Sequence, residues 1–170
     1  AVHEGDKKSG AKEGRKRGIA PTEDLKPFGE FEGPDALEKG FADLKDKSLG
    51  TLPRGNTSET VASWIMDAAG VGYKGLSKVN FVSIADQANM FKDGQISVSM
   101  FISTIPTGGI MDMANSRPVR MLDIPDDVFA ELKKKNSGFD RFTIKKGTYP
   151  GMDADVQSIQ FPAHVIISCK

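Results

Sequence analysis

The chain has 170 residues, of which 38% are hydrophobic and 27% charged, and its 23 basic residues balance 23 acidic ones for a formal net charge of +0. This length fits one ordinary domain or one lobe of a larger protein, and it is too short for two full α/β lobes. The balanced charge predicts no general attraction to nucleic acid or anionic lipid, and no apolar run approaches the roughly 20 residues that a membrane-spanning helix needs.

The first part of the chain, residues 1–36, is hydrophilic and rich in Lys, Arg, Glu, Gly and Pro. Its apolar residues are too sparse to cover a core, so we expect a poorly ordered or atypical segment that the fold can do without. The basic run Lys12–Arg17 is interrupted by an acid and is expected to be solvated. Because the start of the chain lacks the apolar core of a signal peptide, an exported protein would already have lost its signal.

From residue 37 to residue 170, short apolar stretches alternate with amphipathic helical patterns. This alternation is typical of an α/β lobe with a largely parallel sheet flanked by helices. We expect a short helix over 37–46, a strand over 47–52 and a helix over 57–69. Asn56 is the expected N-cap of that helix, Glu59 stands at the capping-box position, and Gly70 provides the stop.

Further units of the same kind follow along the chain. A strand over 79–82 leads to Ser83 as the cap of a helix that ends near Phe91. Apolar residues at every second position from 96 to 102 predict a strand, and after the turn 103–109 a short helix runs to about residue 115. The remaining expected elements are a strand over 119–122, a helix from Pro125 to Lys135, and strands over 142–144 and 159–168.

Catalytic and metal-binding patterns are missing from the sequence. His3 lies in the hydrophilic segment and His164 in an apolar stretch, so neither has a plausible nucleophile or metal partner. Asp153 and Asp155 lack the supporting oxygens of a calcium loop, and Cys169 is the single cysteine. No GxSxG, Walker, HExxH or CxxC motif occurs. We therefore expect no catalytic residue, no metal site and no cofactor.

Two turns between a strand and the next helix are rich in small polar residues, and they form the candidate ligand site. The carboxyl ends of parallel strands open on one edge of the sheet, where ligands bind in open α/β folds, so we expect the two turns to lie side by side. The N–H groups at each helix start could hold a carboxylate. Polar caps begin most helices, however, so a purely structural role stays open. The candidate residues are Gly55, Asn56, Thr57, Ser58, Ser103, Thr104, Pro106 and Thr107.

Four blocks of the sequence occur together and in order. They are FADLKDK at 41–47 with GNTSE at 55–59, MFKDGQI at 90–96, PTGGI at 106–110, and IKKGTYPGMDADV at 144–156. They resemble blocks of the TAXI family of solute receptors, which serve TRAP transporters. The last is the most specific, because it is similar to the family's IPAGTYPGQDEDV.

The resemblance implies a periplasmic-binding-protein-like lobe with part of the hinge. Such a receptor closes two lobes over a small carboxylate or amino acid and presents it, in the periplasm, to a TRAP-type membrane permease. On this basis Arg54 would add charge to the site, and Tyr149 would either pack over the ligand or brace its turn. The chain also departs from the family: residues 1–35 do not resemble the family's first βαβ section, the C-terminal helices are missing, and Thr104 stands where family members have Gly.

Two other functions are compatible with the same fold. A sensory or regulatory domain could bind a similar ligand and signal through a partner. An enzyme on this scaffold is disfavoured, because no acid–base pair or nucleophile converges on the two turns.

Overall fold

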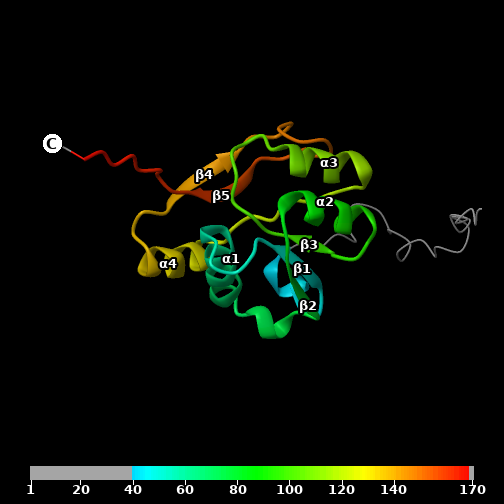
Figure 1. Cartoon of the computed structure of the whole chain (residues 1–170), viewed down its shortest axis with the longest axis horizontal. Helices are drawn as coiled ribbons and strands as arrows, with labels where there is room; N and C mark the ends of the chain where they lie inside the picture. The colour runs from blue at the N-terminus through cyan, green and yellow to red at the C-terminus, as the bar shows by residue number, and fades with distance from the viewer. Residues whose placement is uncertain (1–39, 169–170) are drawn as a thin grey trace, which may run out of the picture. The chain divides into compact units, whose positions relative to one another are not determined.

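The computed structural model describes residues 40–168 (Figure 1). The hydrophilic segment 1–36, for which we expected poor order, lies outside the described residues, as do the first residues of the helix expected over 37–46. The chain divides into two units, residues 1–30 and 31–170, and all the elements below belong to the second.

A parallel sheet of three strands forms the centre of the lobe. Strand β1 (Ser48–Thr51) lies between β2 (Lys78–Phe81) and β3 (Val98–Ser99), and both neighbours run parallel to it. Thr51 at the end of β1 is opposite Phe81 at the end of β2. The predicted α/β fold with a largely parallel sheet is therefore confirmed, and the carboxyl ends of its strands share one edge.

Each strand of this sheet is followed by a helix: α1 (Thr57–Ala68), α2 (Ile84–Lys92) and α3 (Gly108–Ser116). The predicted caps of the first two are present. The Asn56 side chain accepts from the Ser58 N–H at 2.9 Å, and Ser83 Oγ accepts from the Asp86 N–H at 3.2 Å. The capping box expected from Glu59 does not form, because the Asn56 N–H donates instead to the carbonyl of Pro53 at 3.1 Å.

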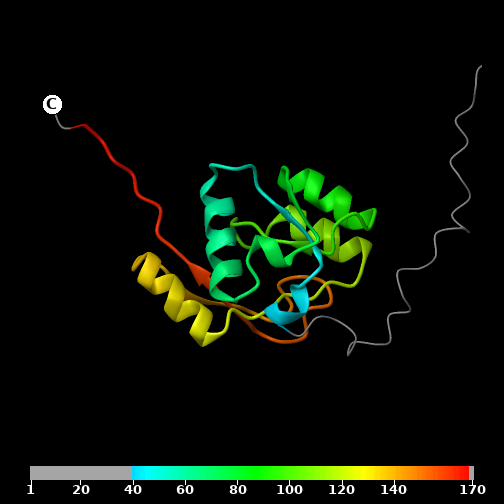
Figure 2. The same ribbon diagram turned by 90° about the horizontal axis from the view of Figure 1, so that it is seen from below.

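Two glycines set local geometry around these helices. Gly70 follows α1 with φ of +74°, a left-handed conformation that glycine adopts without a steric penalty. This confirms the prediction that Gly70 marks the end of the helix. Gly109 allows α3 to approach α2, since a Cβ atom at this position would lie 2.4 Å from Cγ2 of Ile84. Figures 1 and 2 both show α3 beside α2.

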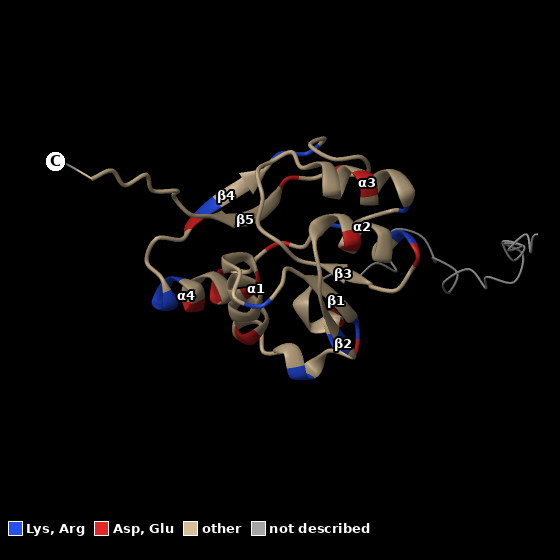
Figure 3. Cartoon of the chain, in the orientation of Figure 1, with Lys and Arg blue, Asp and Glu red and all other residues tan. Residues whose placement is uncertain are grey.

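The main core lies between the sheet, α1 and helix α4 (Asp126–Lys135). Leu49 and Met66 are wholly buried there, and the rings of Trp64 and Phe139 meet edge to face with centroids 6.3 Å apart. Burying side chains of this size stabilises the fold by about 1.5–3 kcal/mol each. Acidic residues in the first turn of α4 and lysines in its last turn complement the helix dipole, as predicted (Figure 3).

A smaller core lies beneath an antiparallel hairpin. Strands β4 (Asp140–Ile144) and β5 (Val156–Gln160) pair over their whole lengths. Ile144, Tyr149 and Val156 are buried together, and Met111 of α3 packs against them. This hairpin therefore supports the start of α3 from a part of the chain about 40 residues further on.

Several expected elements are shorter than predicted. The helix expected over 37–46 appears, within the described residues, as a 3₁₀ turn at Phe41–Leu44. The strand expected over 96–102 is reduced to Val98–Ser99, because the chain beyond Met100 leaves β1 and turns toward α1. Alternating apolar residues thus continue after strand pairing has stopped.

Two strand predictions are wrong. Residues 119–122 form no strand; the segment bonds to β5 only just beyond this point, where the Ile124 N–H donates to the Gln157 carbonyl at 2.8 Å. The strand expected over 159–168 ends at Gln160. After it, Val165 and Ile166 are 92% and 91% exposed, so their apolar pattern does not correspond to a paired strand within the described residues.

Candidate functional site

The start of α1 presents exposed polar groups at the carboxyl end of β1. Arg54, Gly55, Asn56 and Thr57 are all exposed. Asn56 caps the helix with its side-chain oxygen and so satisfies the Ser58 N–H. No acceptor within residues 40–168 pairs with the Thr57 N–H, which is left available at the positive end of the helix.

Ser58 connects the two predicted turns. Its Oγ accepts from the N–H of Ile102 at 2.5 Å, and the residue is only 4% exposed. Ile102 immediately precedes Ser103 and Thr104, both of which are exposed. The structure therefore brings the turn before α1 next to the turn before α3, although Ser58 itself is a buried link between them and not an exposed contact.

The third unit adds a second polar surface along the same edge. Ser103 donates to the Thr104 carbonyl at 3.1 Å, and Pro106 is exposed. Thr107 is half-buried at the cap position of α3, where its side chain makes no capping hydrogen bond. The start of α3 is held instead by Tyr149, which lies more than 40 positions later in the chain.

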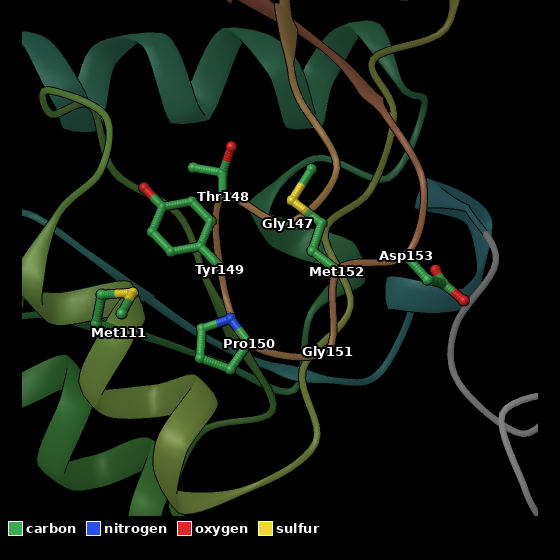
Figure 4. A pocket seen from close by; sticks show the side chains of 8 residues that line it. All are labelled: Met111, Gly147, Thr148, Tyr149, Pro150, Gly151, Met152 and Asp153. Carbon is green, nitrogen blue, oxygen red and sulfur yellow. The ribbon is translucent and has the colours of Figure 1, made fainter.

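Tyr149 braces this turn. Its hydroxyl oxygen accepts from the Thr107 N–H at 3.1 Å, and the residue is 2% exposed. Figure 4 shows the Tyr149 hydroxyl directed away from its own turn, toward the segment that precedes α3. The hydroxyl of Tyr149 therefore braces the turn before α3, which is not the turn that carries Tyr149 itself.

A shallow open pocket of about 540 Å³ lies at the Tyr149 turn (Figure 4). It is lined by Met111 and residues 147–153, and most of this lining is apolar. None of the polar residues before α1 or α3 contributes to it. It is therefore distinct from the polar edge of the sheet and offers a carboxylate little.

Arg54 lies against aromatic residues that the sequence did not single out. Its guanidinium carbon is 4.4 Å from the centroid of the Phe81 ring, and Phe81 meets Tyr73 edge to face at 6.1 Å. The Tyr73 hydroxyl donates to the Glu59 carbonyl at 3.2 Å. Burial, with the negative charge of Glu59 adding to it, raises the pKa of Tyr73 to about 12.

No local signal in the sequence marked this cluster. Thr51 and Phe81 are the last residues of β1 and β2, and the parallel pairing of the two strands places their side chains beside the turn that carries Arg54. Thr51 is wholly buried, and its Oγ1 has no hydrogen-bond partner in the described residues.

Asp155, one of the two acidic residues near the hairpin turn, has a structural role. Asp155 pairs with the Lys145 ammonium at 2.8 Å and accepts from the Lys146 N–H at 2.9 Å, and these hydrogen bonds lower the pKa of its carboxyl group. In the part of the chain that the structure describes, no group of three or more His, Cys, Asp or Glu side chains could hold a metal ion.

None of the helices between residues 40 and 168 combines the length and the apolar character that crossing a membrane requires.

Comparison with protein-family models matches residues 32–169 to the NMT1-like family. The match includes both polar turns and the whole described α/β lobe.

Proposed function

The chain belongs to the NMT1-like family, a periplasmic-binding-protein-like family, and from this membership we infer that it is a solute-binding receptor that binds without catalysis. Binding proteins of this kind are generally extracytoplasmic. We propose further that its ligand is a small carboxylate, an amino acid or a dicarboxylic acid. The proposed binding surface is the edge formed by the turns before α1 and α3.

The observation that carries this proposal is the hydrogen bond from the Ile102 N–H to Ser58 Oγ. It fixes the start of α1 beside Ser103 and Thr104, so exposed hydroxyl groups and the Thr57 N–H share one edge. Hydrogen bonds to a charged group contribute about 1.5–3 kcal/mol each. A few such contacts, less the cost of association, are enough for weak binding by this lobe and for tighter binding when a second lobe closes over the ligand.

A finer assignment rests on the resemblance to TAXI receptors. The blocks at 90–96 and 144–156 support it, and they lie in the same order along the chain. We propose on this basis that the receptor delivers its ligand to a TRAP-type membrane permease. Genes for a large multi-spanning permease beside the gene for this chain would support the assignment, and neighbouring genes for a signalling partner would favour a sensory domain instead.

A charge placed at the start of α1 tests the carboxylate site. Thr57→Asp should preserve the fold, because an acid in the first turn of a helix is favourable. It should also repel an anionic ligand. We expect saturation-transfer NMR to detect binding of L-glutamate or succinate to the unchanged chain and to show a loss of at least about tenfold in affinity for the variant.

The matched control is Ser77→Asp, which adds the same charge in an exposed position just before β2, at the opposite edge of the sheet. It should leave binding unchanged. Equal weakening by both variants would indicate a general charge effect. Binding that survives Thr57→Asp would remove the start of α1 from the site.

A further inference from the structure

A buried amide group lies between α2 and the sheet. The side chain of Gln87, in α2, has no exposed surface. Its Nε2 donates to the Val82 carbonyl at 3.2 Å, and its Oε1 accepts from the Ser99 hydroxyl at 2.7 Å. Val82 follows β2, and Ser99 is the last residue of β3. One side chain of α2 therefore connects the chain at the ends of the two outer strands.

Small residues of the sheet leave room for this amide. Gly50 of β1 is opposite Ser99 of β3. A Cβ atom at Gly50 would lie 3.0 Å from Cγ of Gln87 and 2.6 Å from Cδ1 of Ile96, so glycine is needed at this position. A buried polar pair can be replaced by apolar groups of the same shape at little cost in stability. Packing alone therefore does not require the pair of Gln87 and Ser99.

The pair anchors β3 at the point where strand pairing ends. β3 is only two residues long, and the chain leaves β1 after Met100. Successive residues of a strand point to opposite faces of the sheet. Ser99 accordingly meets Gln87 of α2, whereas Met100 packs against the main core. Two residues later the Ile102 N–H bonds to α1, so this segment is held from both faces of the sheet.

We propose that Gln87 is a positioning residue for the second polar turn, residues 103–107. Because β3 pairs over so short a length, the bonds of Ser99 to α2 and of Ile102 to α1 fix where this turn begins. Without the bond to Gln87, the turn samples positions in which its polar groups no longer lie beside the start of α1. Affinity then falls with the fraction of time that the turn spends in its binding position. The expected effect on affinity rests on the proposed function, whereas the order of the turn can be measured without a ligand.

A double substitution removes the amide and its partner together. In Gln87→Met with Ser99→Ala no buried donor is left without an acceptor, so stability should change little. We expect ¹⁵N relaxation to show increased mobility at the Ser103 and Thr104 amides. NMR titration should show a loss of at least about threefold in affinity for succinate, as for a turn in its binding position a third of the time. Ser99→Ala alone, a milder change, should show the same effects to a smaller extent.

Ser48→Ala is the matched control. The Ser48 hydroxyl donates to the Gln95 carbonyl at 3.2 Å and so joins β1 to the chain just before β3, at the opposite edge of the sheet. This variant should leave the mobility of Ser103 and Thr104 and the affinity for succinate unchanged. Weaker binding by the double variant at unchanged stability separates positioning from packing, because a purely structural role would leave affinity as it was.

The possible failures can be told apart. If Ser103 and Thr104 stay as ordered in the double variant as in the unchanged chain, the inference is overturned, whether or not succinate binds. If the turn loosens but succinate binds as before, the turn lies outside the binding surface and the inference is likewise overturned. If the turn loosens and the unchanged chain binds no succinate, the proposed function fails while Gln87 still positions the turn.

Discussion

The hydroxyl oxygen of Ser58 accepts a hydrogen bond from the N–H of Ile102, 44 residues further along the chain, at 2.5 Å. This contact joins the first turn of α1 to the segment that follows β3. It replaces the strand pairing that the sequence leads one to expect for Ile102, and it sets the spacing of the two polar turns.

Loss of this contact should destabilise the lobe. Ser58→Ala leaves the Ile102 N–H without its acceptor, so we expect the free energy of unfolding to fall by about 1–2 kcal/mol. Ser63→Ala, in the interior of the same helix, should be neutral or slightly stabilising, because alanine has the higher helix propensity. Urea denaturation of both variants measures the difference, and equal stabilities would show that the Ser58 contact contributes nothing.

Adjacent glycines at the start of α3 should respond in opposite ways to the same substitution. Gly109→Ala places a Cβ atom 2.4 Å from Ile84 Cγ2 and should destabilise the lobe by about 1–3 kcal/mol. Gly108→Ala meets no atom within 4 Å and should stabilise it by about 0.4–1 kcal/mol. Thermal unfolding of the two variants tests the close packing of α2 and α3, which would be refuted if Gly109→Ala were tolerated.

Removal of the Tyr149 hydroxyl should loosen the start of α3. In Tyr149→Phe the Thr107 N–H loses its acceptor, so its hydrogen exchange should accelerate about 5- to 13-fold, corresponding to a hydrogen bond of about 1–1.5 kcal/mol. Tyr73→Phe, which alters a hydroxyl bonded at α1, provides the control. Unchanged exchange at Thr107 would contradict the bracing role of Tyr149.

Ionisation of Tyr73 should destabilise the lobe at high pH. Its pKa is about 12 in the folded state, against an ordinary value of 10.0, so the folded state holds the phenolic proton more tightly. The resulting stability is present below pH 10 and is lost as the pH rises toward 12. The free energies of unfolding of the unchanged chain and of Tyr73→Phe, measured as a function of pH, should therefore converge over this range. Parallel curves would show that the pKa of Tyr73 is not raised.

The sequence predicted the parts of the fold that depend on local signals. Asn56, Ser83 and Gly70 mark helix ends through hydrogen bonds and backbone conformations within a few residues, and the helices there are confirmed. The two expected elements that were wrong are strands, because a strand exists only where a partner is available. Residues 119–122 and 161–168 carry apolar residues like those of strands, but no described segment pairs with them.

For the candidate site, the sequence predicted the two polar turns but not the contacts that join them to the rest of the lobe. The strand-to-helix turns could be found from their polar residues and their place in a parallel sheet. The contact between Ser58 and Ile102 and the stacking of Arg54 on Phe81 join residues far apart in sequence, so periodicity gives no signal for them. The hydrogen bond between Thr107 and Tyr149 gives no sequence signal for the same reason, because the two residues are 42 positions apart.

The most direct test of the proposed binding surface is an amide-resolved NMR titration of the ¹⁵N-labelled chain with succinate. We predict that the largest shift changes occur at residues 55–59 and 103–107, which form the polar edge of the sheet. Changes confined to the turn at 147–153, or no change at millimolar succinate, would contradict the account.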